Sequence, residues 1–242
     1  MHHRKIAKNA FSFAEINDYT NIMNWIINFF TSSIGKKIIM SLTGLFLCSF
    51  LLIHLIGNLQ LLYNDGGKAF DVYAKFMGGN PIIKFVSFGL YGSILLHAIQ
   101  GILLYFENKK ARGSSQYAVS YKGKSSSASA YMAVLGTVIL VYILGHLAQF
   151  WYAYKFGEVA AGKVGYYEAV LVAFKNPLFV ALYVIAQIFI ALHLLHGFQS
   201  AFQTLGLNHK KYTPIIKGVG TVYSILIPLG FAIIPIFMYL FR

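Results

Sequence analysis

Five long apolar runs constrain the fold of this chain more than any other feature of its sequence. They cover approximately residues 38–62, 82–106, 130–154, 178–203 and 216–240. A helix rises about 1.5 Å per residue, so each run is long enough to cross roughly 30 Å of hydrocarbon. The chain is 57% hydrophobic and only 11% charged, which argues against a water-soluble domain. The sequence therefore predicts an all-α membrane protein with five transmembrane helices.

The runs divide the chain into two predicted regions. Residues 1–33 are expected to form an amino-terminal extension that includes a short surface helix, with Trp25, Ile26, Phe29 and Phe30 on one face. Residues 34–242 are expected to form a single five-helix domain. The connections at 63–81, 107–129, 155–177 and 204–215 are expected to be loops.

The basic residues predict the orientation of these helices. With the amino terminus inside, thirteen of the twenty Lys and Arg residues fall on the cytoplasmic side and seven on the other. The positive-inside rule then favours a cytoplasmic amino terminus and an outer carboxyl terminus. Because the charges lie between membrane spans, they indicate topology and a lipid bilayer partner, and not nucleic acid. The only cysteine, Cys48, lies in the first run and excludes a disulfide framework.

The sequence contains an internal repeat. The second and fourth runs each begin with Asn-Pro, carry a histidine sixteen residues after the proline, and have a glycine four residues further on, at an offset of 96. The first and third runs each carry a glycine ten residues before a His-Leu pair, at an offset of 92. The matched positions are Pro81/Pro177, His97/His193, Gly101/Gly197, Gly44/Gly136 and His54/His146. We infer two units of two spans with the same orientation, related by an axis along the membrane normal, and an unpaired fifth span.

The repeat places one histidine in each of the first four spans, at two depths. Counted from the cytoplasmic end, His54 and His146 are sixteen residues in, or roughly 24 Å, whereas His97 and His193 are nine or ten residues in, or roughly 14 Å. Ionisable side chains within a membrane are costly and indicate function. The spacing therefore predicts two bis-histidine sites stacked across the membrane.

Two imidazoles at one level suit haem better than zinc. Structural zinc takes about four protein ligands, whereas the porphyrin supplies four nitrogens and leaves two axial positions for histidine. A histidine that only forms an interhelical hydrogen bond is the simpler explanation for any one of them, but four at matched levels favour haem. His196 is a rival ligand to His193, but it aligns with Gln100 in the repeat. A hydrogen bond to a haem propionate or a neighbouring helix is therefore the role predicted for His196.

With these motifs the chain resembles the dihaem cytochrome b membrane-anchor subunit of succinate dehydrogenases and fumarate reductases, of the five-helix, single-anchor type. The resemblance covers about residues 23–242. It rests on HLxxN at His54, HAxxG at His97, a lone histidine late in the third span at His146, and HxxxG followed by SAFQTLG after His193. It implies a proximal haem b on His97 and His193 and a distal haem b on His54 and His146.

The resemblance also implies the reaction and the partners. A flavoprotein subunit with FAD would interconvert succinate and fumarate, an iron–sulfur subunit would relay electrons, and this chain would pass them through two haems to or from menaquinone. The implied location is a bacterial inner membrane, in electron transport linked to the tricarboxylic acid cycle. The chain carries no dicarboxylate active site of its own. Its basic cytoplasmic segments, Lys109 to Lys124 and His209 to Lys211, suit docking of the iron–sulfur subunit.

Quinone reduction needs hydrogen-bond partners for two carbonyl oxygens and a route for protons. Polar and aromatic residues near the outer ends of the first and third spans are the candidates, although aromatic residues are also expected at any membrane interface. They are Asn58, Gln60, Gln149, Trp151 and Tyr152, with Asp65 and Asp71 in the adjoining connection.

Three other classes of protein fit the same sequence less well. A cytochrome b of the quinol–cytochrome c oxidoreductase type would carry two histidines on each of two helices, and here four helices carry one each. A desaturase-like di-iron enzyme would need several histidine boxes, and only HLLH at 193–196 is present. The main alternative is a cofactor-free transporter or assembly scaffold with structural histidines.

Overall fold

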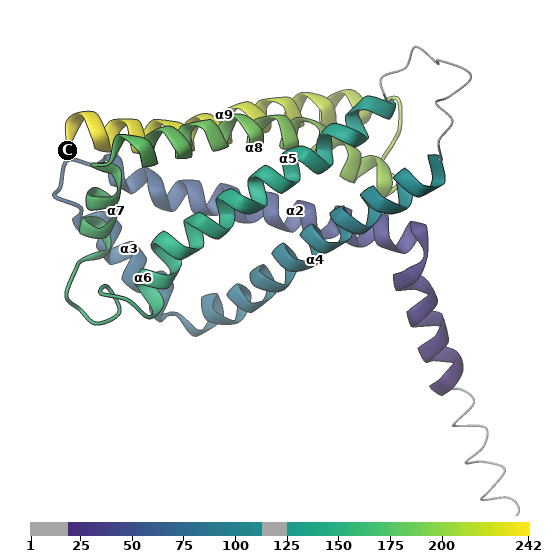
Figure 1. Cartoon of the computed structure of the whole chain (residues 1–242), viewed down its shortest axis with the longest axis horizontal. Coiled ribbons are helices and arrows are strands. Elements are labelled where there is room, and N and C mark those ends of the chain that lie inside the picture. Colours follow the sequence, from purple (N-terminus) through teal and green to yellow (C-terminus); the bar gives the residue numbers. More distant parts are fainter. Residues whose placement is uncertain (1–18, 113–124) are drawn as a thin grey trace, which may run out of the picture.

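The computed structural model describes residues 19–112 and 125–242, and these residues are helical with short connections and no strand. Residues 19–31 form a helix that leads into the first span. The further elements are α2 (Ser33–Asn58), a 3₁₀ turn (Leu59–Leu62), α3 (Lys68–Gly79), α4 (Pro81–Arg112), α5 (Ser125–His146), a π-helical turn (Leu147–Trp151), α6 (Tyr152–Lys155), α7 (Tyr166–Phe174), α8 (Pro177–Thr204) and α9 (Thr213–Phe241). Figure 1 shows the long helices running side by side.

Within the described residues, five helices are long and apolar enough to span a membrane, which confirms the predicted number. They cover Ser33–Leu62, Pro81–Ala111, Tyr131–Lys155, Pro177–Thr204 and Thr213–Phe241. Large apolar side chains such as Leu52, Phe85, Val141 and Leu182 are exposed on the outside of the bundle. Apolar side chains on the outside are what a lipid environment requires, so the chain has the features of a multi-pass membrane protein.

The Asn-Pro pairs of the repeat begin both second helices of the two units. The Asn80 side-chain oxygen accepts a hydrogen bond from the backbone N–H of Ile82, and that of Asn176 accepts one from Leu178, at 2.9 Å in each case. Proline follows at the first helical position, where its missing N–H costs nothing. Sequence and structure therefore agree on where α4 and α8 begin.

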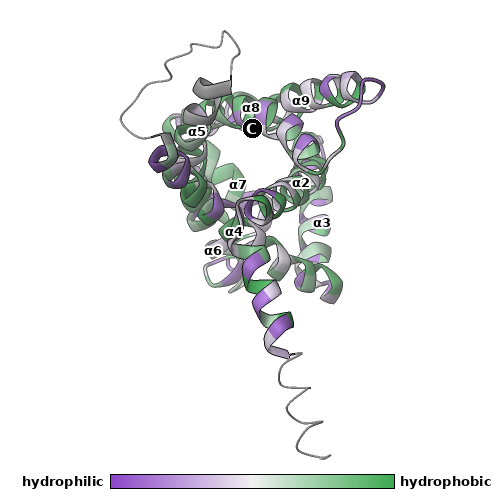
Figure 2. Ribbon diagram, turned by 90° about the vertical axis from the view of Figure 1, so that its right-hand side faces the viewer, coloured by the Kyte–Doolittle hydropathy of each residue, from purple (hydrophilic) through white to green (hydrophobic). Residues whose placement is uncertain are grey.

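The two units of the repeat pack internally in the same way. In the first unit, a Cβ built at Gly101 of α4 would lie 3.5 Å from the Met40 side chain of α2. In the second, a Cβ at Gly197 of α8 would lie 3.7 Å from Met132 of α5. Met40 and Met132 occupy matched positions at the offset of 92. Viewed along the bundle, α4, α2, α9, α8 and α5 surround a common centre (Figure 2).

The unpaired span, α9, packs against one helix from each unit. A Cβ at Gly220 would lie 2.7 Å from the Phe198 ring of α8, and one at Gly230 would lie 2.8 Å from Leu55 of α2. The Tyr223 hydroxyl donates to the Cys48 carbonyl of α2 at 2.6 Å. Small residues that let backbones approach closely are typical of membrane helix packing, and here they join α9 to both units.

The connections at 63–81 and 155–177 differ from the predicted loops, because each contains a helix. α3 and α7 lie at the end of the bundle that carries the carboxyl terminus (Figure 1). Asp71 of α3 accepts a hydrogen bond from the Tyr167 N–H of α7 at 2.7 Å. Helices this short depend on tertiary packing, and the sequence pattern alone gave too little signal to predict them.

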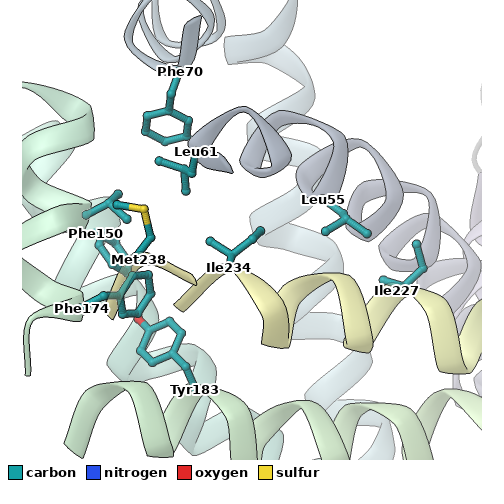
Figure 3. Close-up of a cluster of buried hydrophobic side chains, with 10 residues drawn as sticks. Leu55, Leu61, Phe70, Phe150, Phe174, Tyr183, Ile227, Ile234 and Met238 are labelled. Atoms are coloured by element: carbon teal, nitrogen blue, oxygen red, sulfur yellow. The ribbon is translucent and has the colours of Figure 1, made fainter. Parts of the chain in front are cut away.

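A cluster of buried side chains anchors this end of the bundle. It brings together Phe150 after α5, Phe174 of α7, Tyr183 of α8 and Met238 of α9, as Figure 3 shows. Nearby, the Asp65 carboxylate accepts hydrogen bonds from the N–H groups of Ala69 at 2.8 Å and Gly67 at 2.9 Å. The bond from Ala69 is the main cause that holds the pKa of Asp65 below its usual value. The carboxylate therefore stays ionised at neutral pH and caps α3.

Candidate functional site

The structure brings His97 and His193 together in the half of the bundle nearer the amino-terminal helix. Their ring centroids lie 6.2 Å apart with an interplanar angle of 70°. Each ring also contacts the glycine that the repeat aligned in the first helix of its own unit. A Cβ at Gly44 would lie 3.1 Å from His97 Cε1, and one at Gly136 would lie 3.8 Å from His193 Cε1. The two glycines thus make room for the two rings.

His54 and His146 form a second pair nearer the carboxyl-terminal end. Their ring centroids lie 6.0 Å apart, and the rings are nearly perpendicular at 86°. Aromatic side chains surround them: Phe50 stacks on His54 at 5.1 Å, and Phe150 lies 5.5 Å from His146. The other rings of this shell are Tyr142, Tyr183 and Phe231. The pair therefore lies in an apolar surrounding.

In one histidine of each pair, a hydroxyl oxygen lies within hydrogen-bond distance of Nδ1. Thr43 Oγ1 donates to the Ile39 carbonyl at 2.7 Å and lies 3.2 Å from His97 Nδ1. A Thr43 hydroxyl that donates to Ile39 can accept from His97 Nδ1–H, which would leave Nε2 unprotonated. Tyr183 likewise donates to Gln149 at 2.8 Å and lies 3.3 Å from His146 Nδ1. This tautomer, held by a partner at the other nitrogen, is the one that ligates metal through Nε2.

The other members of the pairs have different surroundings. Asn58 lies one turn after His54, and its Nδ2 is 3.3 Å from His54 Nδ1 and donates to the His54 carbonyl at 2.7 Å. His193 Nδ1 is buried without a hydrogen-bond partner in the described part of the chain. The repeat explains this difference, since Leu135 stands where the first unit has Thr43.

Each histidine pair offers two metal ligands, so it suits a metal whose remaining ligands come from a cofactor. No three His, Cys, Asp or Glu side chains come together anywhere in residues 19–112 and 125–242. Two imidazoles that bind one metal from opposite sides through bonds of about 2.0–2.1 Å would have ring centroids roughly 6.3 Å apart. The observed spacings are 6.2 and 6.0 Å. Each pair offers two imidazoles, which is the number of protein ligands that a haem iron takes and two fewer than a structural zinc site needs.

Buried polar atoms near the histidines also lack partners. Among the described residues these are Gln100 Oε1, Gln187 Oε1 and His193 Nδ1. Gln100 lies one turn after His97, and Gln187 lies one turn after Tyr183. A buried polar group without a partner costs free energy.

The residues predicted for a quinone region separate into different surroundings. Trp151 Nε1 donates to the Tyr91 hydroxyl at 2.7 Å, and Gln149 accepts from Tyr183, so both polar groups hold helices together. Tyr152 is exposed on the outside of the bundle. Asn58 bonds to His54, as described above. Gln60 and Asp65 line a pocket.

That pocket lies between the end of the first span and α3. Its volume is about 590 Å³, and its lining is Gln60, Asp65, Lys68, Ala69, Val72, Tyr73 and Phe76. The Tyr73 ring packs directly on Gly57, three residues after His54, where any Cβ would overlap it. Burial raises the pKa of Tyr73, so the phenol keeps its proton at neutral pH. The pocket thus combines an apolar wall with hydrogen-bonding side chains at the end of the bundle nearer the His54/His146 pair.

His196 belongs to neither histidine pair. Its side chain is exposed and lines a groove of about 320 Å³ between α5 and α8, together with Tyr131, Met132, Leu135 and Leu192. The role predicted for His196 beside a propionate stays a prediction.

Sequence reasoning missed three residues of these sites: Thr43, Tyr73 and Tyr183. Thr43 precedes the repeat glycine Gly44, so its distance from His97 could have been inferred from the pairing of the helices. Tyr183 lies on α8, and the chain widens into a π-helical turn directly after His146. Tyr73 belongs to α3, whose position depends on tertiary packing.

Comparisons of the chain with protein-family models, with curated proteins and with solved structures find no match.

Gly44 and Gly136, which occupy matched positions of the repeat, are expected to respond differently to substitution by alanine. Gly44→Ala places a methyl group 3.1 Å from His97 Cε1, closer than nine in ten real Cβ contacts, whereas Gly136→Ala makes an ordinary contact at 3.8 Å with His193. If each pair holds a haem, Gly44→Ala should shift the redox potential or the optical band of the His97 site, and Gly136→Ala should leave both near the parent values. Redox titration followed by absorbance measures this. Equal shifts in the two variants would contradict the described packing.

Proposed function

We propose that this chain is the dihaem cytochrome b membrane-anchor subunit of a succinate:quinone oxidoreductase, and that it transfers electrons between an iron–sulfur subunit and membrane menaquinone. The observation that carries the proposal is the pair of bis-histidine arrangements at two levels of one bundle, with centroid spacings of 6.2 and 6.0 Å. The order of the sequence motifs along the chain supports the choice of family.

In this proposal His97 and His193 hold one haem b, and His54 and His146 hold the other. Bound haem b supplies one-electron redox chemistry at each level. Thr43 and Tyr183 keep His97 and His146 in the tautomer that presents Nε2. The aromatic side chains around the outer pair exclude water and lower the local dielectric, and both effects tune a redox site.

We place the proposed menaquinone site in the pocket of Gln60 and Tyr73. Tyr73 keeps a hydroxyl proton that it can donate to a quinone carbonyl, and Gln60 offers an amide. Lys68 and Asp65 at the same pocket provide charged groups near its opening for proton exchange with the aqueous side. Val72 and Phe76 are exposed and continue the apolar wall outward, where an isoprenoid tail could leave into lipid.

The iron–sulfur subunit is proposed to dock at the opposite end, nearer the His97/His193 pair. The exposed connection between α8 and α9 carries His209, Lys210 and Lys211 there. Lys109 and Lys110 extend the same basic end from α4, and the rest of that predicted docking segment, 113–124, lies outside the described residues. A cluster of positive charges favours encounter with a partner whose surface is negatively charged.

The proposal is tested in the complex purified from native membranes with its partner subunits. Succinate is expected to reduce b-type haem and to support reduction of a menaquinone analogue. Tyr73→Phe keeps the ring against Gly57 but removes the proposed hydrogen bond, so quinone reduction should slow about tenfold, the rate equivalent of about 1.4 kcal/mol.

Tyr152→Phe is the matched control, because Tyr152 is exposed and outside the pocket. It should keep the parent rate. Loss of rate in Tyr152→Phe but not in Tyr73→Phe would move the quinone site to α6. A colourless complex without succinate-dependent activity would contradict the proposed function as a whole and favour the transporter or scaffold.

A further inference from the structure

The helix of residues 19–31 runs across the direction of the membrane spans. In Figure 1 it leaves the amino-terminal end of α2 and points away from the bundle, while α2, α4, α5, α8 and α9 run along the long axis of the molecule. If the spans follow the membrane normal, this helix lies close to the plane of the membrane surface. It lies at the end of the bundle where α2 begins.

The helix has separate apolar and polar faces. At 3.6 residues per turn, its eight apolar residues occupy one continuous arc of about 200°, and its five polar residues fill a separate arc of about 100°. The apolar residues are Tyr19, Ile22, Met23, Trp25, Ile26, Ile27, Phe29 and Phe30, and the polar ones are Thr20, Asn21, Asn24, Asn28 and Thr31. The bundle does not bury the apolar arc: Trp25 is 68% exposed and Ile22 57%.

A closely packed corner sets the direction of this helix relative to α2. Ser32 caps α2, since its side chain accepts a hydrogen bond from the Gly35 N–H at 3.0 Å. The same hydroxyl donates back to the Phe29 carbonyl at 2.9 Å. A Cβ at Gly35 would overlap that carbonyl, so only glycine allows the approach. The corner therefore holds the helix across the spans.

We propose that the helix of residues 19–31 is an in-plane membrane anchor, with its apolar face in the acyl chains of the leaflet on the amino-terminal side. The apolar face continues onto the lipid-facing side of α2, where Ile34 is 72% exposed and Leu42 is 54% exposed. Trp25 is a residue type that prefers the membrane interface. The helix contains no charged residue, so burial of apolar area drives its insertion and anionic lipid is not required.

Spin labels on the full chain in phosphatidylcholine vesicles test this proposal. Cys48→Ser removes the only cysteine, and single cysteines then replace exposed residues of each face. Ile22→Cys and Ile26→Cys report on the apolar face, and Asn24→Cys and Asn28→Cys are the matched controls on the polar face. The measurement is the collision rate of each label with oxygen, which concentrates in lipid, relative to a water-soluble nickel chelate.

We expect the oxygen-to-nickel ratio to be several-fold higher at the two isoleucine positions than at the two asparagine positions. The ratios should not change when anionic lipid is added. Equal, nickel-rich ratios at all four positions would show a helix in water and overturn the proposal. Labels at the isoleucine positions that are shielded from both reagents and broaden one another would instead show a second copy on this face, and would overturn it too.

Discussion

We expect His97→Ala to lose one of two b-type haems from the purified protein and to retain the other. His97 and His193 face each other at 6.2 Å, and the part of the chain that the structure describes offers no third histidine, cysteine or carboxylate to the pair. A haem with one protein ligand should dissociate on purification. A pyridine haemochrome assay gives the haem content, and a redox-difference spectrum shows which band is lost.

Because the histidines lie in pairs, a set of four variants tests the arrangement more strictly than one variant does. His193→Ala should give the same spectrum as His97→Ala, because both remove a ligand of the same site. His54→Ala and His146→Ala should share a different spectrum, because their rings lie 6.0 Å apart at the other level. Exogenous imidazole should restore haem to each variant by occupying the space of the missing ring.

His209→Ala and His196→Ala are the controls, since both side chains are exposed and belong to neither pair. Each should keep two haems per chain. Four histidine variants with four unrelated spectra would contradict the two-site arrangement. A folded parent protein that takes up no haem when haem is supplied would leave the histidines as structural residues of a transporter or scaffold.

The second large effect concerns stability and involves two neighbouring glycines before α3. Gly67 has φ +84° and packs against the Tyr167 ring of α7, whereas Gly66 has φ +69° and nothing within 4 Å of a built Cβ. Alanine at either position costs about 1–2 kcal/mol because L residues resist this conformation. Gly67→Ala should cost about 1–3 kcal/mol more, because the methyl group overlaps a packed ring.

Unfolding of the detergent-solubilised protein, followed by circular dichroism, measures the difference between Gly67→Ala and Gly66→Ala. In a Tyr167→Ala background the two glycine variants should become nearly equal, since the ring that causes the overlap is gone. Similar stabilities of the two variants in the parent background would show that α7 does not pack on the start of α3 as described.

Much of the bundle could be predicted because its signals are local in the sequence. A run of about 20 apolar residues satisfies its own backbone hydrogen bonds only as a helix in lipid, so five runs gave five spans. Asn-Pro gave the starts of α4 and α8, because the capping amide and the proline act within one turn. The repeat offsets placed His97 level with His193 and His54 level with His146, because helical rise converts residue count into depth.

Other features had no local signal. α3 and α7 were expected to be loops, and they form helices because their apolar residues are buried against the bundle and against each other. The candidate quinone residues looked equivalent in sequence, yet Gln149 and Trp151 bond to Tyr183 and Tyr91 on other helices. Tyr73, which no motif singled out, lies instead beside Gly57.

The sequence by itself thus determined the five long apolar helices, their order and which histidines share a level, since backbone hydrogen bonding and helical rise depend on residues close along the chain. Only the tertiary structure decided which side chains surround each histidine pair and which polar groups remain available for a ligand. It also decided which surfaces stay uncovered. Those properties depend on contacts between residues far apart in the chain, such as Tyr183 with His146 and Tyr167 with Asp71.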